Sequence, residues 1–160
     1  MSKHEELVET YAAHYLNPNN RHMRLFPDVL PALERLREAG YWLSVATGKG
    51  RSGLNQAIAQ TGTGDFWLAT ACASECPSKP APDMVWRLCD ELGVMPSESI
   101  VIGDTAFDLE MAAHAGARGI GVATGAHSRE TLQSAPNIGI LSCFGELEGF
   151  LQRQGSIEAV

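Results

Sequence analysis

Short apolar runs alternate with helical segments along most of this sequence, and that alternation restricts the fold to a narrow class. The runs have the length of buried strands and are bounded by glycine and proline. They span residues 41–46, 66–71, 99–102, 118–122 and 138–141. Runs of this kind, without polar alternation, are typical of parallel strands that are covered on both faces.

The segments between the runs carry helical signals. In residues 28–39, Leu30, Leu33 and Leu36 lie on roughly one face, and Gly40 stands where a C-terminal cap would. Further helices are predicted over residues 82–92, 106–115, 128–134 and 144–153. Alternating strands and helices predict an α/β fold with a mostly parallel sheet.

The first residues break this pattern. Residues 3–16 are predicted to be helical, because Leu7, Tyr11 and Tyr15 recur at a four-residue spacing, and residues 17–27 then form a connection. The chain is therefore expected to begin with a helix and a loop, before the alternation starts.

Size and charge restrict the function classes. The 160 residues predict one compact domain, and the net charge of -7 argues against nucleic acid or an anionic membrane as the main partner. A local positive pocket for a small anion remains compatible with that charge. No apolar run reaches the roughly 18 residues of a membrane helix. The polar N-terminus is unlike a signal peptide, and the four cysteines show no C-x-x-C or zinc spacing, so a cytoplasmic protein with reduced thiols is expected.

Ligands bind at the carboxyl ends of the strands in open parallel sheets, so the residues after each run are candidates. Thr47-Gly48-Lys49-Gly50 follows the run 41–46 and offers a hydroxyl and backbone N–H groups to an anion. It is not a Walker A loop, because the upstream glycine and the Ser/Thr after the lysine are missing. Taken alone, a tight turn with a capping threonine is the simpler interpretation.

Lys79 follows the run 66–71 and lies between prolines, just before a predicted helix. The helix dipole disfavours a cation there by about 0.3–1 kcal/mol at an exposed site. A nearby anion would compensate for that cost. A surface lysine in a proline-rich turn is equally compatible.

Two acids follow the run 99–102, namely Asp104 and Asp108 in Gly103-Asp104-Thr105-Ala106-Phe107-Asp108. A spacing of four places them on one face of a starting helix, where the dipole keeps carboxylates ionised. Such oxygen ligands suit Mg²⁺. Helix capping by Thr105 or an aspartate is the alternative, although capping needs only one acid. A hydroxyl, an ammonium and two carboxylates at neighbouring strand ends together fit phosphoryl chemistry with a divalent ion.

These segments resemble motifs two, three and four of the haloacid dehalogenase-like superfamily, in order and spacing, over roughly residues 22–152. The family reads K-P-x-P around the lysine and G-D-x-x-x-D around the acids. Residues 25–33 are similar to the L-F-P-x-V-x-x-A-L segment of its phosphoglycolate phosphatase-like branch. The resemblance implies a Rossmann-like core and a Mg²⁺-dependent phosphatase that acts on a small phosphorylated metabolite.

The resemblance also implies roles for individual residues. Thr47 and the backbone N–H of Gly48 would bind the phosphoryl group, and Lys79 would neutralise its charge. Asp104 would bind Mg²⁺, and Asp108 would support the metal or the lysine. The helix predicted over residues 3–16 resembles the last helix of the family's cap. Residues 1–21 are therefore assigned to a cap remnant and linker, and residues 22–160 to an incomplete core domain.

The family's first motif, D-x-D-G-T, has no counterpart in this chain, because none of the aspartates stands in a D-x-D pattern. In the family this motif supplies the nucleophile and the acid/base, and Asp28, at a helix start, is a poor substitute. The strand that carries the motif lies in the middle of the family's sheet. The resemblance therefore predicts a core without its central strand, with unpaired backbone groups on both neighbours.

Three explanations are considered, in this order. The chain is an incomplete part of an ordinary phosphatase, or a binding or regulatory protein that has lost its nucleophile, or an enzyme that takes a nucleophile from another chain. Either the two neighbours of the missing strand pair directly, or another segment fills the position, and a second copy of this chain in a homo-oligomer is one candidate. The chain alone is expected to bind phosphate or Mg²⁺ weakly and not to turn over. Arg51, His127 and Arg129 lie near the predicted site, but solvated or packing roles are favoured for them.

Overall fold

A sheet of six parallel strands forms the centre of the protein. The structure, a computed structural model, describes residues 6–9, 27–124 and 127–158. The strand order is β3-β2-β1-β4-β5-β6, and every neighbouring pair is parallel. The strands are β1 (Glu6–Glu9), β2 (Trp42–Thr47), β3 (Trp67–Cys72), β4 (Ser99–Gly103), β5 (Arg118–Val122) and β6 (Gly139–Leu141).

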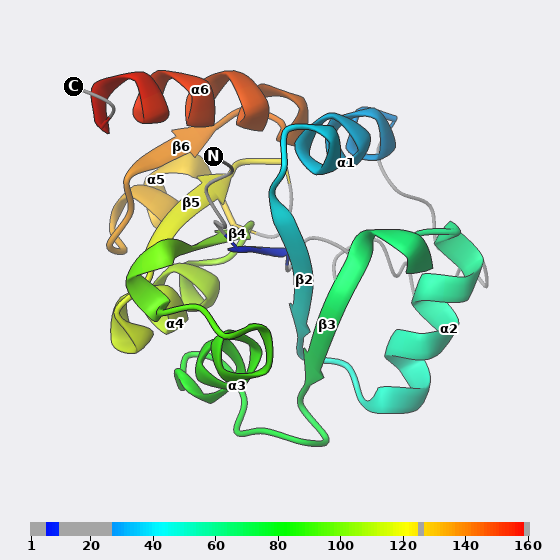
Figure 1. Ribbon diagram of the computed structural model, residues 1–160. Coiled ribbons are helices and arrows are strands. Elements are labelled where there is room, and N and C mark those ends of the chain that lie inside the picture. Colours follow the sequence, from blue (N-terminus) through cyan, green and yellow to red (C-terminus); the bar gives the residue numbers. More distant parts are fainter. Residues whose placement is uncertain (1–5, 10–26, 125–126, 159–160) are drawn as a thin grey trace.

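Helices cover both faces of this sheet, so the layers stack as helix, sheet and helix (Figure 1). Helices α1 (Val29–Glu38) and α6 (Leu147–Glu158) pack on one face, and α3 (Asp83–Leu92) and α4 (Ala106–Ala115) pack on the other. The chain also forms α2 (Arg51–Thr61), which packs through Leu54 onto β2 and β3, and the short α5 (Arg129–Gln133). None of the helices in the described ranges is long and apolar enough to span a bilayer.

The five strands predicted from apolar runs are all present. Their buried positions alternate between the two helical layers, so each strand is apolar on both faces. Ile100 and Ile102 of β4 join the core under α1 and α6, whereas Val101 joins the core under α3 and α4. Each of these side chains is at most 1% exposed. Burial of an aliphatic side chain contributes about 1.5–3 kcal/mol, so strands covered on both sides read as continuous apolar runs.

The structure corrects the prediction that the core lacks its central strand. Residues Glu6–Glu9 form β1, which pairs in parallel with β2 on one side and with β4 on the other. The helix predicted over residues 3–16 is therefore wrong for these four residues. The four-residue spacing was compatible with a helix. A strand, however, supplies hydrogen-bond partners to the backbone groups of β2 and β4 that face this position, and burying those groups without partners would be costly.

The filling of the central position has two consequences. The sheet closes with a strand from the same chain, so a homo-oligomer that supplies this strand is not needed. Residues 6–9 belong to the core sheet and not to a cap. The rest of the predicted cap remnant and the boundary between residues 21 and 22 lie outside the described residues.

Candidate functional site

Three loops lie at the carboxyl ends of β2, β3 and β4. The chain places β2 and β3 on one side of β1 and β4, β5 and β6 on the other, so the strand order reverses between β1 and β4. Ligands of doubly wound sheets bind at such a reversal, outside the carboxyl ends. The loops after β2, β3 and β4 carry the predicted residues Thr47, Lys79, Asp104 and Asp108.

The strand register places Thr47 and Asp104 at the same level on either side of β1. Glu9 pairs with Val45 of β2 and with Ile102 of β4. Thr47 and Asp104 each lie two residues beyond these partners. Two strand spacings, about 9–10 Å, therefore separate their backbones. β1 ends at Glu9, two residues before this level, and residues 10–26 lie outside the described part of the chain.

Thr47 is a buried strand end that also shapes the following turn. Its side chain is 1% exposed, and its Oγ1 accepts a hydrogen bond from the N–H of Lys49 at 3.2 Å. Gly48 is exposed, and a Cβ there would meet no atom within 4 Å. Burial lowers the pKa of Lys49. The tight turn is present, but the helix-capping role considered for the threonine is not, because Gly50 stands at the N-cap of α2 without a side-chain cap. The hydroxyl hydrogen of Thr47 can still be donated.

Lys79 and Asp108 form a buried ion pair that joins the second and third loops. The Nζ of Lys79 lies 2.6 Å from Oδ1 of Asp108, and the two side chains are 12% and 0% exposed. The Lys79–Pro80 peptide bond is cis. A compensating anion and a surface lysine were equally compatible with the sequence, and in this structure Asp108 is the anion that lies against Lys79.

The segment from Gly103 to Asp108 is held by a second set of contacts. Thr105 caps α4, and its N–H and Oγ1–H both donate to Oδ2 of Asp108, at 3.2 and 2.8 Å. A Cβ at residue 103 would overlap the side chain of Asp108, so only glycine fits there. Asp104 is fully buried at the end of β4. In the pattern G-D-x-x-x-D, the glycine is therefore required because no side chain fits there, and the last aspartate because its charge pairs with Lys79.

A charged clamp beside these loops was not recognised in the sequence. Arg51 donates from Nε and Nη2 to the two carboxylate oxygens of Glu75, at 2.9 and 2.7 Å, and from Nη1 to Oγ1 of Thr70 at 2.7 Å. Hydrogen bonds from Arg51 lower the pKa of Glu75 to about 2. The clamp ties the start of α2 to the loop after β3. The two residues are 24 apart, so no local pattern predicts the pair.

His127 contacts the third loop, whereas Arg129 does not. The backbone N–H of His127 donates to the carbonyl of Asp104 at 3.2 Å, and its Nδ1 accepts from the N–H of Ala106 at 2.9 Å. The guanidinium of Arg129 instead donates to the carbonyl of Ile140 and to Oγ of Ser142. Of the two residues suggested near the mouth of the site, the structure brings only His127 to it.

The residues at the site fit a divalent metal in part. A buried carboxylate at a strand end is a hard oxygen ligand of the kind that Mg²⁺ accepts, and Asp104 provides one. Asp108 is engaged by Lys79 and Thr105 instead. Across residues 6–9, 27–124 and 127–158, no group of three or more His, Cys, Asp or Glu residues is arranged to hold a metal ion. Asp28 lies elsewhere, because its Oδ2 accepts from the N–H of Gly145 at 2.7 Å.

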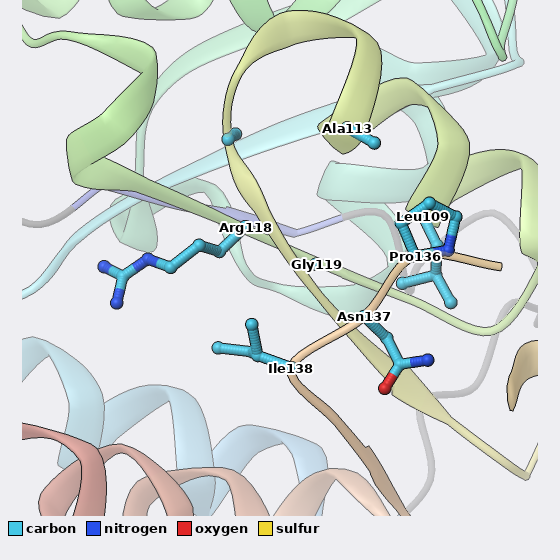
Figure 2. A pocket seen from close by; sticks show the side chains of 8 residues that line it. Leu109, Ala113, Arg118, Gly119, Pro136, Asn137 and Ile138 are labelled. Atoms are coloured by element: carbon cyan, nitrogen blue, oxygen red, sulfur yellow. The ribbon is translucent and has the colours of Figure 1, made fainter.

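Two hollows lie away from this site. One, of about 190 Å³, is lined by Leu109 and Ala113 of α4, by residues 117–119 and by residues 136–138 (Figure 2). Figure 2 shows the Arg118 side chain extending away from Leu109 and Pro136. The other, of about 270 Å³, lies beside the first residues of β2 and β3. Both lie at the amino ends of strands, whereas the three loops lie at the carboxyl ends.

Comparisons with known proteins agree on one family. The sequence profile of the haloacid dehalogenase-like hydrolases matches residues 1–144. The chain is 29% identical over 133 residues to pyrophosphatase PpaX of Bacillus velezensis, covering 82% of this chain and 62% of that protein. It is 31% identical over 112 residues to the plasmid phosphoglycolate phosphatase of Cupriavidus necator, covering 69% of this chain and 48% of that protein.

The fold agrees with this relationship. The crystal structure of a predicted phosphoglycolate phosphatase from Haemophilus somnus superimposes with a TM-score of 0.75 at 25% identity, over 80% of this chain and 57% of that one. The chain thus spans roughly half to three fifths of the length of these relatives. On the profile match, the sequence motifs and the fold, the chain belongs to the haloacid dehalogenase-like hydrolase family.

Proposed function

We propose that this domain provides the phosphate-binding and metal-binding part of a phosphatase that acts on small phosphate monoesters. The observation that supports the proposal is the ion pair of Lys79 with Asp108 at 2.6 Å, at the strand-order reversal where Thr47 and Asp104 follow β2 and β4. Phosphatases among the relatives support the reaction class. The substrate that we propose is a small phosphorylated metabolite.

Each residue has a definite task in this proposal. The Oγ1–H of Thr47 and the N–H of exposed Gly48 donate to phosphoryl oxygens at the end of β2. Lys79 lowers the electrostatic cost of bringing negative charge to the site, and Asp108 keeps its ammonium in place. Asp104 would hold Mg²⁺, whose chemistry is the neutralisation of charge on the phosphoryl oxygens.

The 160 residues alone are proposed to bind without turnover. No D-x-D pattern is present in the sequence, so the family's nucleophile and acid/base have no counterpart here. Asp104 is a single carboxylate, and Mg²⁺ typically takes one or two carboxylates together with phosphate oxygens and water. Weak binding of phosphate and Mg²⁺ follows.

Hydrolysis of an aryl phosphate tests the proposal. The purified chain, with and without Mg²⁺, is compared with its Asp104→Asn variant. We expect no magnesium-dependent hydrolysis above the level of the variant. Magnesium-dependent turnover that the variant lacks would mean that the chain carries a substitute nucleophile, and the proposal of binding without turnover would be wrong.

Calorimetric titration with Mg²⁺ and inorganic phosphate examines the binding part. We expect weak binding of both, with Mg²⁺ binding lost in Asp104→Asn and phosphate binding weakened in Thr47→Val, which keeps the shape and removes the hydroxyl. Unchanged phosphate affinity in Thr47→Val would remove the proposed role of that residue. Tight Mg²⁺ binding by the wild-type chain would show a more complete ligand set than Asp104 provides.

A further inference from the structure

His127 is joined to the Asp104 segment by two hydrogen bonds. Its backbone N–H donates to the carbonyl of Asp104 at 3.2 Å. Its ring nitrogen Nδ1 accepts from the N–H of Ala106, 21 residues away, at 2.9 Å. The two bonded groups belong to the residues immediately before and after Thr105. His127, which follows β5, therefore holds the backbone on both sides of Thr105, next to the buried carboxylate of Asp104.

The hydrogen bond to the His127 ring satisfies the N–H of Ala106, which has no acceptor within α4. Ala106 is the first residue of α4, and the first N–H groups of a helix have no acceptor within the helix. Thr105 and Asp108 form a capping box, in which Oγ1 of Thr105 accepts from the N–H of Asp108 at 3.3 Å. For Ala106 the acceptor is the imidazole of His127.

The same contact determines the state of the imidazole. A ring nitrogen that accepts a hydrogen bond carries no proton, so the neutral ring has its proton on Nε2. The ring of Phe107 lies against the imidazole, with centroids 5.8 Å apart and an angle of 59° between the planes. The ring is therefore oriented by a hydrogen bond and by an aromatic contact.

We propose that His127 is a positioning residue for Asp104. By holding the carbonyl of Asp104 and the first N–H of α4, it keeps the buried carboxylate in the orientation that a divalent cation requires. The inference rests on the proposed function, because it assigns Asp104 to the metal. Side chains that support metal ligands commonly change metal affinity about 10–100-fold when they are replaced.

Three substitutions at residue 127 distinguish the role of the Nδ1 acceptor from that of the volume of the ring. The Oδ1 of the variant His127→Asn occupies the place of Nδ1 and retains an acceptor for Ala106. The amide of His127→Gln reaches the place of Nε2 and lacks that acceptor. His127→Ala removes both. All three keep the backbone N–H that donates to Asp104, so the series isolates the ring contact.

The measurement is Mn²⁺ affinity by electron paramagnetic resonance, with Asp104→Asn as the baseline. We expect His127→Ala and His127→Gln to weaken Mn²⁺ binding about tenfold or more, and His127→Asn to retain most of it. The inference is overturned if His127→Asn binds as weakly as His127→Ala, or if His127→Ala binds like the wild-type chain. Denaturant unfolding of each variant confirms that folded protein is compared.

A second readout separates this inference from the proposed function. Long-range ¹H–¹⁵N spectra of the wild-type chain should show the Nε2–H tautomer, and the Ala106 amide should exchange slowly in the wild-type chain and in His127→Asn but faster in His127→Ala. An Nδ1–H tautomer overturns the inference whatever the metal result. A different outcome is that the tautomer and the exchange are as expected, but the wild-type chain binds Mn²⁺ no more tightly than the variant Asp104→Asn. That outcome refutes the metal role of Asp104 in the proposed function.

Discussion

Gly103 and Asp108 show how one backbone position can require a particular residue. Asp108 points back over the end of β4 to reach Lys79 and Thr105, and its side chain fills the space that a Cβ at residue 103 would occupy. The carboxylate cannot swing away without breaking the ion pair. The glycine is thus needed for close approach, not for a special backbone angle.

Replacement of this glycine should destabilise the fold. Gly103→Ala forces a methyl group against a fully buried side chain, and overpacking of this kind costs about 1–3 kcal/mol. Gly53→Ala is the matched control, because a Cβ there meets only Lys49, at 3.8 Å, and the position lies in α2. We expect the control to be neutral or stabilising by up to about 1 kcal/mol. Chemical denaturation measures both, and equal effects would contradict the steric explanation.

At the scale of elements, the loops of the site are joined by contacts between parts that are distant in the sequence. The clamp between Arg51 and Glu75 joins the start of α2 to the loop after β3, and the backbone N–H of Ala73 donates to the carbonyl of Lys49 at 3.0 Å. The pair Lys79–Asp108 then joins that loop to α4. Each loop of the site is therefore held by contacts with the next.

The clamp predicts a pH dependence of stability. The pKa of Glu75 falls from 4.5 to about 2 in the folded protein, so its contribution is present above pH 4.5 and is lost as the pH falls towards 2. We expect Glu75→Gln to unfold at lower denaturant concentration than the wild-type chain at neutral pH, with the difference shrinking as the pH falls through that range. Arg51→Gln should remove the same pH-dependent part. Parallel pH profiles of the three proteins would contradict the assignment.

The central strand can be tested through its backbone. A proline has no N–H, and every N–H of a central strand faces a neighbouring strand, so Val8→Pro should leave a buried acceptor without its donor at a cost of at least about 1–3 kcal/mol. Val8→Ile keeps the N–H and serves as the control. Hydrogen exchange of the β2 and β4 amides measures the effect. Unchanged protection in Val8→Pro would mean that these strands do not depend on β1.

At the scale of the whole molecule, the sheet is complete within one chain. The position between β2 and β4 is occupied by residues 6–9, and all five strand pairings lie in the same polypeptide. The two helical layers then cover the sheet from both sides (Figure 1). Among the strands of the described residues, every backbone edge in the middle of the sheet is paired, so none is left for a second copy to fill.

Light scattering after size exclusion tests this conclusion. We expect the mass of one chain, since strand exchange would replace a pairing that already exists. A stable dimer that dissociates in Val8→Pro but not in Val8→Ile would point to β1 being shared between two copies, and would contradict pairing within one chain.

Local patterns in the sequence were sufficient for most of the fold and for the choice of site residues. The apolar runs predicted five strands and the glycines marked helix ends, because burial on two faces and chain reversal act over a few neighbouring residues. The residues Thr47, Lys79, Asp104 and Asp108 were chosen because they follow strands. The pairing of β1, the Arg51–Glu75 clamp and the contact of His127 with Ala106 were decided only in the tertiary structure. The family resemblance left Asp108 to support either the metal or the lysine, and the structure pairs it with Lys79. These contacts join residues that are far apart in sequence, and their energies depend on which backbone edges and charges the packed sheet and helices bring together.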